Sequence, residues 1–205
     1  KYYIDDYSVW IKSLEDHNKI KDITFTFNEQ TKSLSPVIKY GRYKERLVCV
    51  LPFYNKGSML NYIFTHESLK LYQPTVISMV QQLLLQLAAL HGHDYTHGDI
   101  KTENVCVHDN GEYLEARLID FETVRGETES YSNLLRRGSS LALNSDYYSP
   151  KMIRERLLYA YSNEVKTCNL VHVYLHAMGV FISEMLFRRS IFRTHVDWQK
   201  DDDIN

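Results

Sequence analysis

The segment His97-Gly98-Asp99-Ile100-Lys101-Thr102-Glu103-Asn104, with Asp120-Phe121 further along the chain, decides how this sequence is interpreted. An Asp can accept or orient the proton of a hydroxyl group, and a Lys can neutralise a phosphoryl group in transfer. Asn and Asp supply the oxygen ligands that Mg²⁺ prefers. The two acids, the lysine and the amide are therefore the groups that phosphoryl transfer needs, because this chemistry depends on positioning and charge stabilisation.

Helical periodicity places this segment behind a rigid helix. Pro74–Leu90 is the strongest helical pattern, since Pro suits a first turn and apolar residues recur on one wide face. Residues 4–17 have the spacing of an amphipathic helix. The apolar run Leu170–Phe187 contains two histidines and a glutamate, so it is expected to be a buried helix rather than a membrane span.

Short apolar segments predict strands in the first part of the chain and around the motif. The predicted strands are Ile23–Phe27, Pro36–Tyr43 and Arg46–Leu51, with a hairpin of Val105–Val107 and Tyr113–Ile119 around Asn110-Gly111. Ser58 is expected to cap a short helix that runs through Tyr62. Residues 28–35 are polar, and residues 122–149 form a long polar loop. Strands followed by helices predict an α+β fold.

Composition narrows the class of protein. A length of 205 residues suits one domain with a real core, and a net charge of −2 excludes a strongly basic nucleic-acid arm. No nucleic-acid partner is therefore expected. Three cysteines without a CxxC motif predict a reducing, cytoplasmic environment rather than a disulfide framework. No signal peptide or lipid anchor is visible, so no membrane partner is expected either.

The motifs resemble those of eukaryotic protein kinases, over roughly residues 36–192. His97-x-Asp99-x-Lys101-x-x-Asn104 is similar to the catalytic loop, and Asp120-Phe121 is similar to the metal-binding motif that follows a hairpin. A lysine two residues after the aspartate is the Ser/Thr-kinase pattern. The resemblance implies a protein-kinase-like two-lobe fold. Residues 1–54 would form an incomplete β-rich N-lobe and the hinge, and residues 55–205 a helical C-lobe with the catalytic loop and activation segment.

The resemblance also implies a role for each site residue. Asp99 would be the catalytic base, Lys101 would neutralise the γ-phosphate of ATP, and Asn104 and Asp120 would hold Mg²⁺. A protein substrate or a regulatory protein is the implied partner. The adenine of ATP would bind at the gatekeeper and hinge positions, which fall on Leu51, Pro52, Phe53 and Tyr54.

Several positions depart from the family pattern. No glycine-rich loop or Val-Ala-x-Lys strand precedes the motifs, so the ATP-anchoring lysine is expected to be missing or to lie upstream of Lys1. Glu15 and Glu29 are both candidates for the carboxylate partner of that lysine. The usual arginine, glycine, glutamate, aspartate and threonine of the family are replaced by Gly98, Glu122, Lys151, Tyr174, and Asn144 or Ser145.

These departures leave three hypotheses open. The first is an active Ser/Thr-type protein kinase, because all four catalytic groups are present. The second is a pseudokinase that acts as a scaffold or regulatory module with weak or no catalysis, because the supporting positions have changed. A small-molecule kinase of the same fold is the third, although such enzymes less often keep the lysine at position 101 together with an activation segment that ends at a proline.

Overall fold

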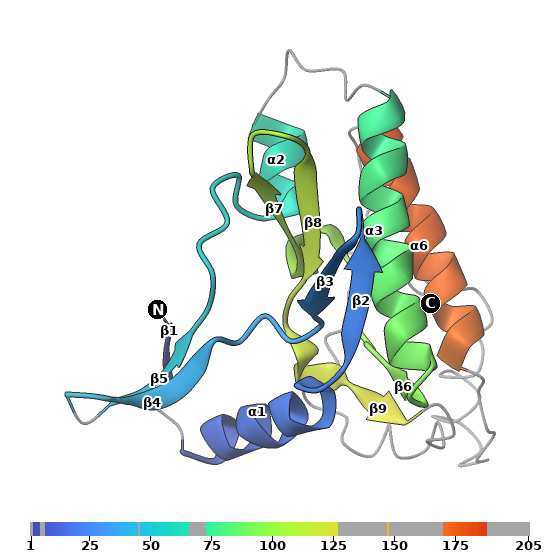
Figure 1. The fold of residues 1–205 in the computed structure, drawn as a ribbon. Coiled ribbons are helices and arrows are strands. Elements are labelled where there is room, and N and C mark those ends of the chain that lie inside the picture. Colours follow the sequence, from blue (N-terminus) through green and yellow to red (C-terminus); the bar gives the residue numbers. More distant parts are fainter. Residues whose placement is uncertain are drawn as a thin grey trace, which may run out of the picture.

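A small antiparallel sheet and one helix form the beginning of the chain. The computed structural model describes residues 2–4, 7–44, 46–65, 73–126, 147 and 170–187. The strands are ordered β1 (Tyr2–Ile4), β5 (Arg46–Val50) and β4 (Lys39–Tyr43). Helix α1 (Tyr7–Ile20) lies beside this sheet (Figure 1). The predicted strands at 36–43 and 46–51 are confirmed as β4 and β5.

Strand β1 was not predicted, because three residues carry too little pattern to show a period. It pairs with β5 in the register Tyr2 to Cys49 and Ile4 to Leu47. The predicted helix at 4–17 is confirmed as α1, but the pairing of Ile4 with β5 moves the start of the helix to Tyr7. The chain therefore enters α1 directly from a strand of the sheet.

A second hairpin lies between α1 and β4. Strand β2 (Thr24–Phe27) pairs with β3 (Gln30–Ser33) through a turn in which Asn28 and Glu29 have positive φ angles. The first strand agrees with the prediction, since Phe25 and Phe27 alternate inward and are buried. Strand β3 was missed because its side chains are polar and mostly exposed. The hairpin packs against the long helix α3 rather than against the sheet (Figure 1).

Helices and short strands form the rest of the described chain. Helix α2 (Met59–Thr65) begins after Ser58, whose Oγ accepts the backbone N–H of Asn61 at 3.2 Å, as the predicted cap requires. The predicted long helices are confirmed as α3 (Gln73–His91) and α6 (Leu170–Phe187). The predicted hairpin is β7 (Val105–Asp109) with β8 (Leu114–Leu118), and Gly111 in its turn has φ +91°. Shorter elements are β6 (Tyr95–Thr96), η1 (Thr102–Asn104), η2 (Phe121–Thr123) and β9 (Arg125–Gly126), where β6 pairs with β9.

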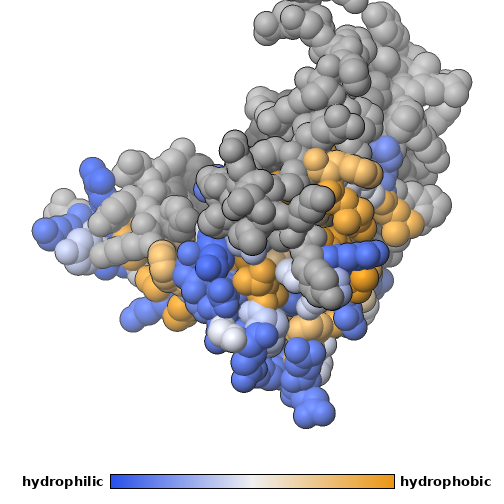
Figure 2. Space-filling model, turned by 90° about the horizontal axis from the view of Figure 1, so that it is seen from above, coloured by the Kyte–Doolittle hydropathy of each residue, from blue (hydrophilic) through white to orange (hydrophobic). Residues whose placement is uncertain are grey.

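Helices α3 and α6 each bury one apolar face, and some apolar side chains elsewhere on the two helices remain exposed. Leu83, Leu87 and Phe181 are fully buried in the core between the elements. Ile77, Leu84 and Leu186 remain exposed along a groove between the two helices. Hydrophobic side chains also reach the surface among hydrophilic ones when the molecule is seen from above (Figure 2). Among the helices described, none is long and apolar enough to cross a membrane.

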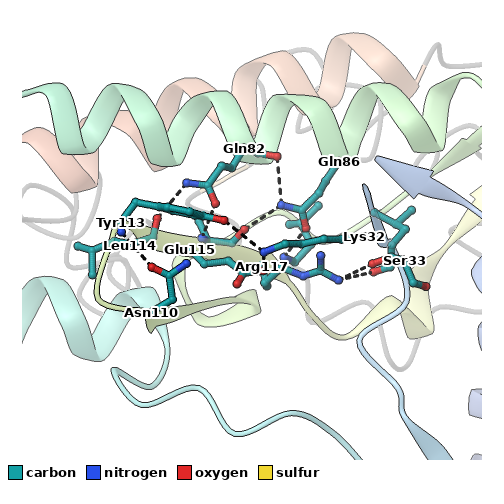
Figure 3. A network of polar contacts seen from close by, with 12 residues as sticks. Lys32, Ser33, Gln82, Gln86, Asn110, Tyr113, Leu114, Glu115 and Arg117 are labelled. Atoms are coloured by element: carbon teal, nitrogen blue, oxygen red, sulfur yellow. Dashed lines mark hydrogen bonds and ion pairs between the residues drawn. The ribbon is translucent and has the colours of Figure 1, made fainter. Parts of the chain in front are cut away.

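Two glutamine side chains of α3 form hydrogen bonds with the edge of β8 that does not pair with β7 (Figure 3). Gln82 Nε2 donates to the carbonyl of Leu114 at 2.9 Å, and its Oε1 accepts the N–H of Ala116 at 3.0 Å. Gln86 repeats this pattern one turn later, with the carbonyl of Ala116 at 2.8 Å and the N–H of Leu118 at 3.0 Å. The two amides thus replace a neighbouring strand and satisfy buried peptide groups.

We predict that Gln86→Leu lowers the free energy of unfolding by roughly 2–5 kcal/mol, because it leaves one buried N–H and one buried C=O without their partner. Chemical denaturation of the purified protein measures this change. Gln81→Leu is the matched control, since Gln81 lies on the same helix but is exposed. Equal effects of the two substitutions would show that the amide contacts to β8 contribute nothing.

Candidate active site

His97 anchors the predicted catalytic loop inside the protein. Its ring is fully buried, and its Nε2 lies 3.0 Å from the carbonyl of Ile119, while its Nδ1 accepts the N–H of Asp99 at 3.3 Å. One ring nitrogen therefore donates and the other accepts, which is the pattern of a neutral imidazole. Burial lowers the pKa of His97, against the raising effect of the Ile119 carbonyl. The ring also packs against Phe121, with 4.9 Å between ring centroids.

Lys101 and Asn104 converge on the carboxylate of Asp99. The Nζ of Lys101 lies 2.6 Å from Oδ2 of Asp99, and Nδ2 of Asn104 donates to the same oxygen at 2.9 Å. Asn104 also donates to the backbone carbonyl of Asp99 at 2.9 Å. The loop therefore brings together the three predicted catalytic residues. Asp99 and Lys101 keep 15% and 19% of their side chains exposed, so a bound molecule can reach them.

A side chain at position 98 would clash with Thr123, which explains the glycine there. Gly98 has φ +90°, and a Cβ built on it would lie 2.5 Å from the carbonyl oxygen of Thr123. The hydroxyl of Thr123 donates to the carbonyl of His97 at 2.7 Å, which holds the two segments together. No side chain fits at position 98 in this arrangement, which excludes the arginine expected there.

Asp120 begins the segment that faces the catalytic loop. Its backbone is left-handed, with φ 60° and ψ 69°, and Phe121 behind it is buried. The N–H of Ile119 donates to the carbonyl of Asn104 at 2.9 Å. This backbone hydrogen bond joins one predicted metal ligand, Asn104, to the residue that directly precedes the other, Asp120. Glu122, where glycine was expected, lies in the helical turn η2 and not among the residues with positive φ, which explains why a side chain is tolerated there.

A cavity of about 290 Å³ lies between α1, the sheet and Asp120. Leu51 and Cys49 line it from β5 and its end, and Asp16 lines it from α1. Asp16 is buried, and its two carboxylate oxygens bind Lys12 at 3.2 Å and Lys19 at 2.6 Å. The predicted gatekeeper and the predicted metal ligand thus share one cavity.

Asp16 was missed by the sequence reasoning, which favoured Glu15 or Glu29 as the helix carboxylate. Glu15 is exposed, and Glu29 lies in the turn between β2 and β3. Neither residue lines the cavity. Helical spacing was the signal that could have found Asp16, because it is four residues before Ile20, which is fully buried and lines the same cavity.

The rest of the predicted hinge lies outside this cavity. Pro52 is exposed and Phe53 is 84% exposed, whereas Tyr54 is half-buried. Burial raises the pKa of Tyr54, and the nearby guanidinium of Arg117 opposes that shift. Asn55 then fixes the end of the segment, since its side chain exchanges hydrogen bonds with the backbone of Asp109 at 2.9 and 2.8 Å.

Comparison with known proteins decides the family. The protein kinase domain model matches residues 9–204 of the chain. The chain belongs to the protein kinase domain family. The predicted α+β kinase fold is therefore confirmed, with a small β-rich beginning and a helical remainder.

Three curated relatives carry kinase names. The chain is 34% identical over 70 residues to serine/threonine-protein kinase dkf-2 of Caenorhabditis briggsae, which is 34% of this chain and 6% of that protein. It is 35% identical over 92 residues to protein kinase kin1 of Schizosaccharomyces pombe, covering 45% and 9%. It is 25% identical over 159 residues to serine/threonine-protein kinase Nek5 of Mus musculus, covering 71% and 24%. The chain thus covers a quarter or less of the length of each of these relatives.

The kinase domain also links its catalytic loop to α6. Thr102 donates from its backbone N–H to the hydroxyl of Tyr147 at 3.2 Å, and its own hydroxyl donates to Glu184 at 3.2 Å. The hydroxyl of Tyr147 donates to the same carboxylate, and burial raises the pKa of Tyr147 well above its usual range. The predictions for Asn144, Ser145, Lys151 and the side chain of Tyr174 lie outside the described residues.

Candidate metal ligands were sought among the side chains that the structure describes. The described residues contain no group of three or more His, Cys, Asp or Glu side chains that could hold a metal ion. The donor set predicted for Mg²⁺, one carboxylate (Asp120) and one amide oxygen (Asn104), stays a prediction.

We predict that Gly98→Ala destabilises the kinase domain by about 1–3 kcal/mol, because a Cβ there meets Thr123 and φ is positive. Thermal unfolding measures the loss. Adding Thr123→Ala does not restore stability, since the closest atom is the backbone carbonyl of Thr123. Gly41→Ala is the control, because nothing lies within 4 Å of its Cβ position and its φ is not positive. Wild-type stability of Gly98→Ala would contradict the steric explanation.

Proposed function

We propose that this chain is the catalytic domain of a protein kinase that transfers the γ-phosphoryl group of ATP to serine or threonine of a protein substrate. The observation that carries the proposal is the convergence of Lys101 and Asn104 on Oδ2 of Asp99. These contacts orient the carboxylate and leave its other oxygen for a substrate hydroxyl. The matched kinase family and the kinase names of the relatives support the same reaction.

In the proposed reaction, the hydroxyl oxygen of the substrate forms a bond to the γ-phosphorus while the bond from that phosphorus to the bridging β,γ-oxygen breaks. Asp99 accepts the hydroxyl proton, and ADP leaves with the electron pair of the broken bond. Lys101 stabilises the negative charge that is spread over the γ-phosphoryl oxygens. Asp120 and the side-chain oxygen of Asn104 would hold Mg²⁺, which supplies charge neutralisation for the phosphates when bound.

Residues 1–54 would supply the nucleotide side of the cleft, and residues 55–205 the catalytic and substrate side. Leu51 and Tyr54 are proposed to contact the nucleotide, together with Pro52 and Phe53 between them. Lys1 is the candidate for the ATP-anchoring lysine, because it directly precedes β1, and β1 leads into the helix that carries Asp16. Asp16, which is buried and lines the cavity, is the proposed carboxylate partner of that lysine.

One observation favours a second function. Both carboxylate oxygens of Asp16 already bind lysines of its own helix, Lys12 and Lys19. Lys12 also donates to the backbone carbonyl of Glu122 at 2.5 Å and so connects α1 to the Asp120 segment. Contacts of this kind, made by the protein's own lysines, suit a pseudokinase that acts by binding a regulatory protein.

Phosphoryl transfer from radiolabelled ATP to a library of Ser- and Thr-containing peptides tests the proposal with the full-length protein. We expect Asp99→Asn to reduce transfer by roughly 10²–10⁴-fold, since it removes the proton acceptor. Binding of Mg·ATP, measured as a thermal shift, should be retained in Asp99→Asn and lost in Asp120→Asn. Glu112→Gln is the control, because Glu112 is exposed in the β7–β8 turn.

Two results would decide against catalysis. Nucleotide binding without transfer in the wild-type protein would favour the pseudokinase. Absence of both transfer and a nucleotide-dependent thermal shift would refute the kinase proposal altogether.

A further inference from the structure

We propose that Thr102 is a positioning residue, which holds the catalytic loop against α6 through the buried side chains of Tyr147 and Glu184. This inference rests on the proposed function, in which Asp99 and Lys101 act directly on the reacting groups. No role for Thr102 or Tyr147 was expected from the sequence.

The three side chains come from distant parts of the chain and meet in the protein interior. Thr102 begins η1 and is 1% exposed, while Tyr147 is 6% exposed and Glu184 on α6 is 5% exposed. Thr102 and Tyr147 are 45 positions apart in the sequence, and Thr102 and Glu184 are 82 positions apart. Their contacts are therefore tertiary contacts, which fix the loop relative to a long helix.

The hydrogen bonds hold Thr102 both by its backbone and by its side chain. Its N–H donates to the hydroxyl of Tyr147 at 3.2 Å, and that hydroxyl donates to Oε2 of Glu184. The hydroxyl of Thr102 donates to the same oxygen of Glu184 at 3.2 Å. An ionised carboxylate can accept both protons, because each of its oxygens has two lone pairs. Two fixed points on one residue determine where that residue lies and how it is oriented.

Glu103 provides a second acceptor for the hydroxyl of Thr102. Its Oε2 lies 3.3 Å from Oγ1 of Thr102, and its side chain is only half-buried. A hydroxyl group has one proton, so it donates either to Glu103 or to Glu184 at a given moment. The bond from the backbone N–H of Thr102 to Tyr147 does not depend on that choice. The loop is therefore attached to α6 in both cases.

The polar character of this cluster argues for more than packing. Burial of a carboxylate or a hydroxyl group is unfavourable unless it is hydrogen-bonded, and apolar side chains of similar volume would fill the same space without needing partners. Hydrogen bonds to an ionised acceptor are shorter and stronger than those between neutral groups. A buried polar cluster whose members are hydrogen-bonded to one another specifies a single arrangement. Here that arrangement includes the backbone of the catalytic loop.

The position of Thr102 determines the path of the loop on both sides of it. Turn η1 has three residues and is closed by the N–H of Asn104, which donates to the carbonyl of Lys101 at 3.0 Å. A turn this short has little stability of its own, so its place depends on outside contacts. Lys101 and Asn104 flank Thr102 in this turn and both reach Oδ2 of Asp99, at 2.6 and 2.9 Å. Displacement of Thr102 would therefore misplace both residues that orient Asp99.

Steady-state kinetics of the full-length protein separate positioning from stability. The assay uses Mg·ATP and a Ser- or Thr-containing peptide that the wild type phosphorylates. We expect Thr102→Val, which removes the hydroxyl but keeps the side-chain shape, to lower kcat by roughly five- to tenfold, because reaction rates depend steeply on the placement of the reacting groups. The KM for Mg·ATP should stay within about twofold of the wild type, since the lost interaction acts in the transition state. Thr102→Ser keeps the hydroxyl and should keep the wild-type kcat.

Tyr147→Phe is the stronger variant. It removes the acceptor of the Thr102 N–H and a donor to Glu184, so we expect kcat to fall by about 10²-fold. Tyr113→Phe is the matched control, because the Tyr113 hydroxyl contacts Lys32 and not the loop.

A second control lies on α6 itself. The hydroxyl of Ser183, next to Glu184, donates to the carbonyl of Gly179 at 2.9 Å. Ser183→Ala therefore removes a hydroxyl from the same helix without touching the loop, and it should keep the wild-type kcat.

Two kinetic results would overturn the proposal. A wild-type kcat in Thr102→Val and Tyr147→Phe, with a lower Tm, would leave the cluster with a structural role alone. An equal loss of kcat in Thr102→Ser and Thr102→Val would show that the hydroxyl is not the cause. If Tyr147→Phe fails to fold, the comparison of Thr102→Val with Thr102→Ser decides.

Amide hydrogen exchange distinguishes failure of this inference from failure of the proposed function. If the wild-type protein transfers no phosphoryl group, the proposed function fails, and exchange still tests whether the cluster holds the loop. Residues 99–101 and 104 should then exchange faster in Tyr147→Phe than in Tyr113→Phe. Equal exchange at these residues would overturn the positioning role.

Discussion

The structure depends on how strand β8 is held. Its backbone pairs with β7 on one edge and with the amides of Gln82 and Gln86 on the other. A two-stranded hairpin alone is marginally stable in water. Here helix α3 packs against the hairpin and hydrogen-bonds to the edge of β8 that does not pair with β7. The backbone of β8 is therefore held at both edges. This strand contains the buried Arg117, which contacts the β2–β3 hairpin, and it ends two residues before Asp120.

The catalytic loop is built on the end of that strand. Ile119 directly precedes Asp120. Its carbonyl accepts a hydrogen bond from His97, and its backbone N–H donates to the carbonyl of Asn104. His97 is thereby fixed as a neutral, buried ring against Phe121. The loop between these anchors ends in η1, which places Asn104 so that it can share one oxygen of Asp99 with Lys101.

Sequence reasoning predicted the parts of this arrangement that have a strong period or a strong motif. Helices α3 and α6 have wide apolar faces, and Asp99, Lys101 and Asn104 were expected together and are found together. Strand β3 could not be predicted, because its side chains are polar and its pairing depends on the turn at Asn28. Asp16 was not considered because a charged residue gives no apolar signal, although its spacing of four residues from Ile20 places it on the buried face of α1. The steric need for Gly98 depends on Thr123, a contact that no local pattern encodes.

The lysines around Asp16 do not by themselves close the nucleotide side of the cleft. Lys12 and Lys19 keep 54% and 41% of their side chains exposed, and ion pairs with such exposed partners contribute little free energy, about 0–1 kcal/mol. A lysine that approached Asp16 from the cavity would be shielded from water, so its attraction to the carboxylate would be larger than theirs. Such a lysine would compete with Lys12 and Lys19 for the carboxylate of Asp16. The lysines bound to Asp16 thus favour the pseudokinase only weakly, because both of them are largely exposed.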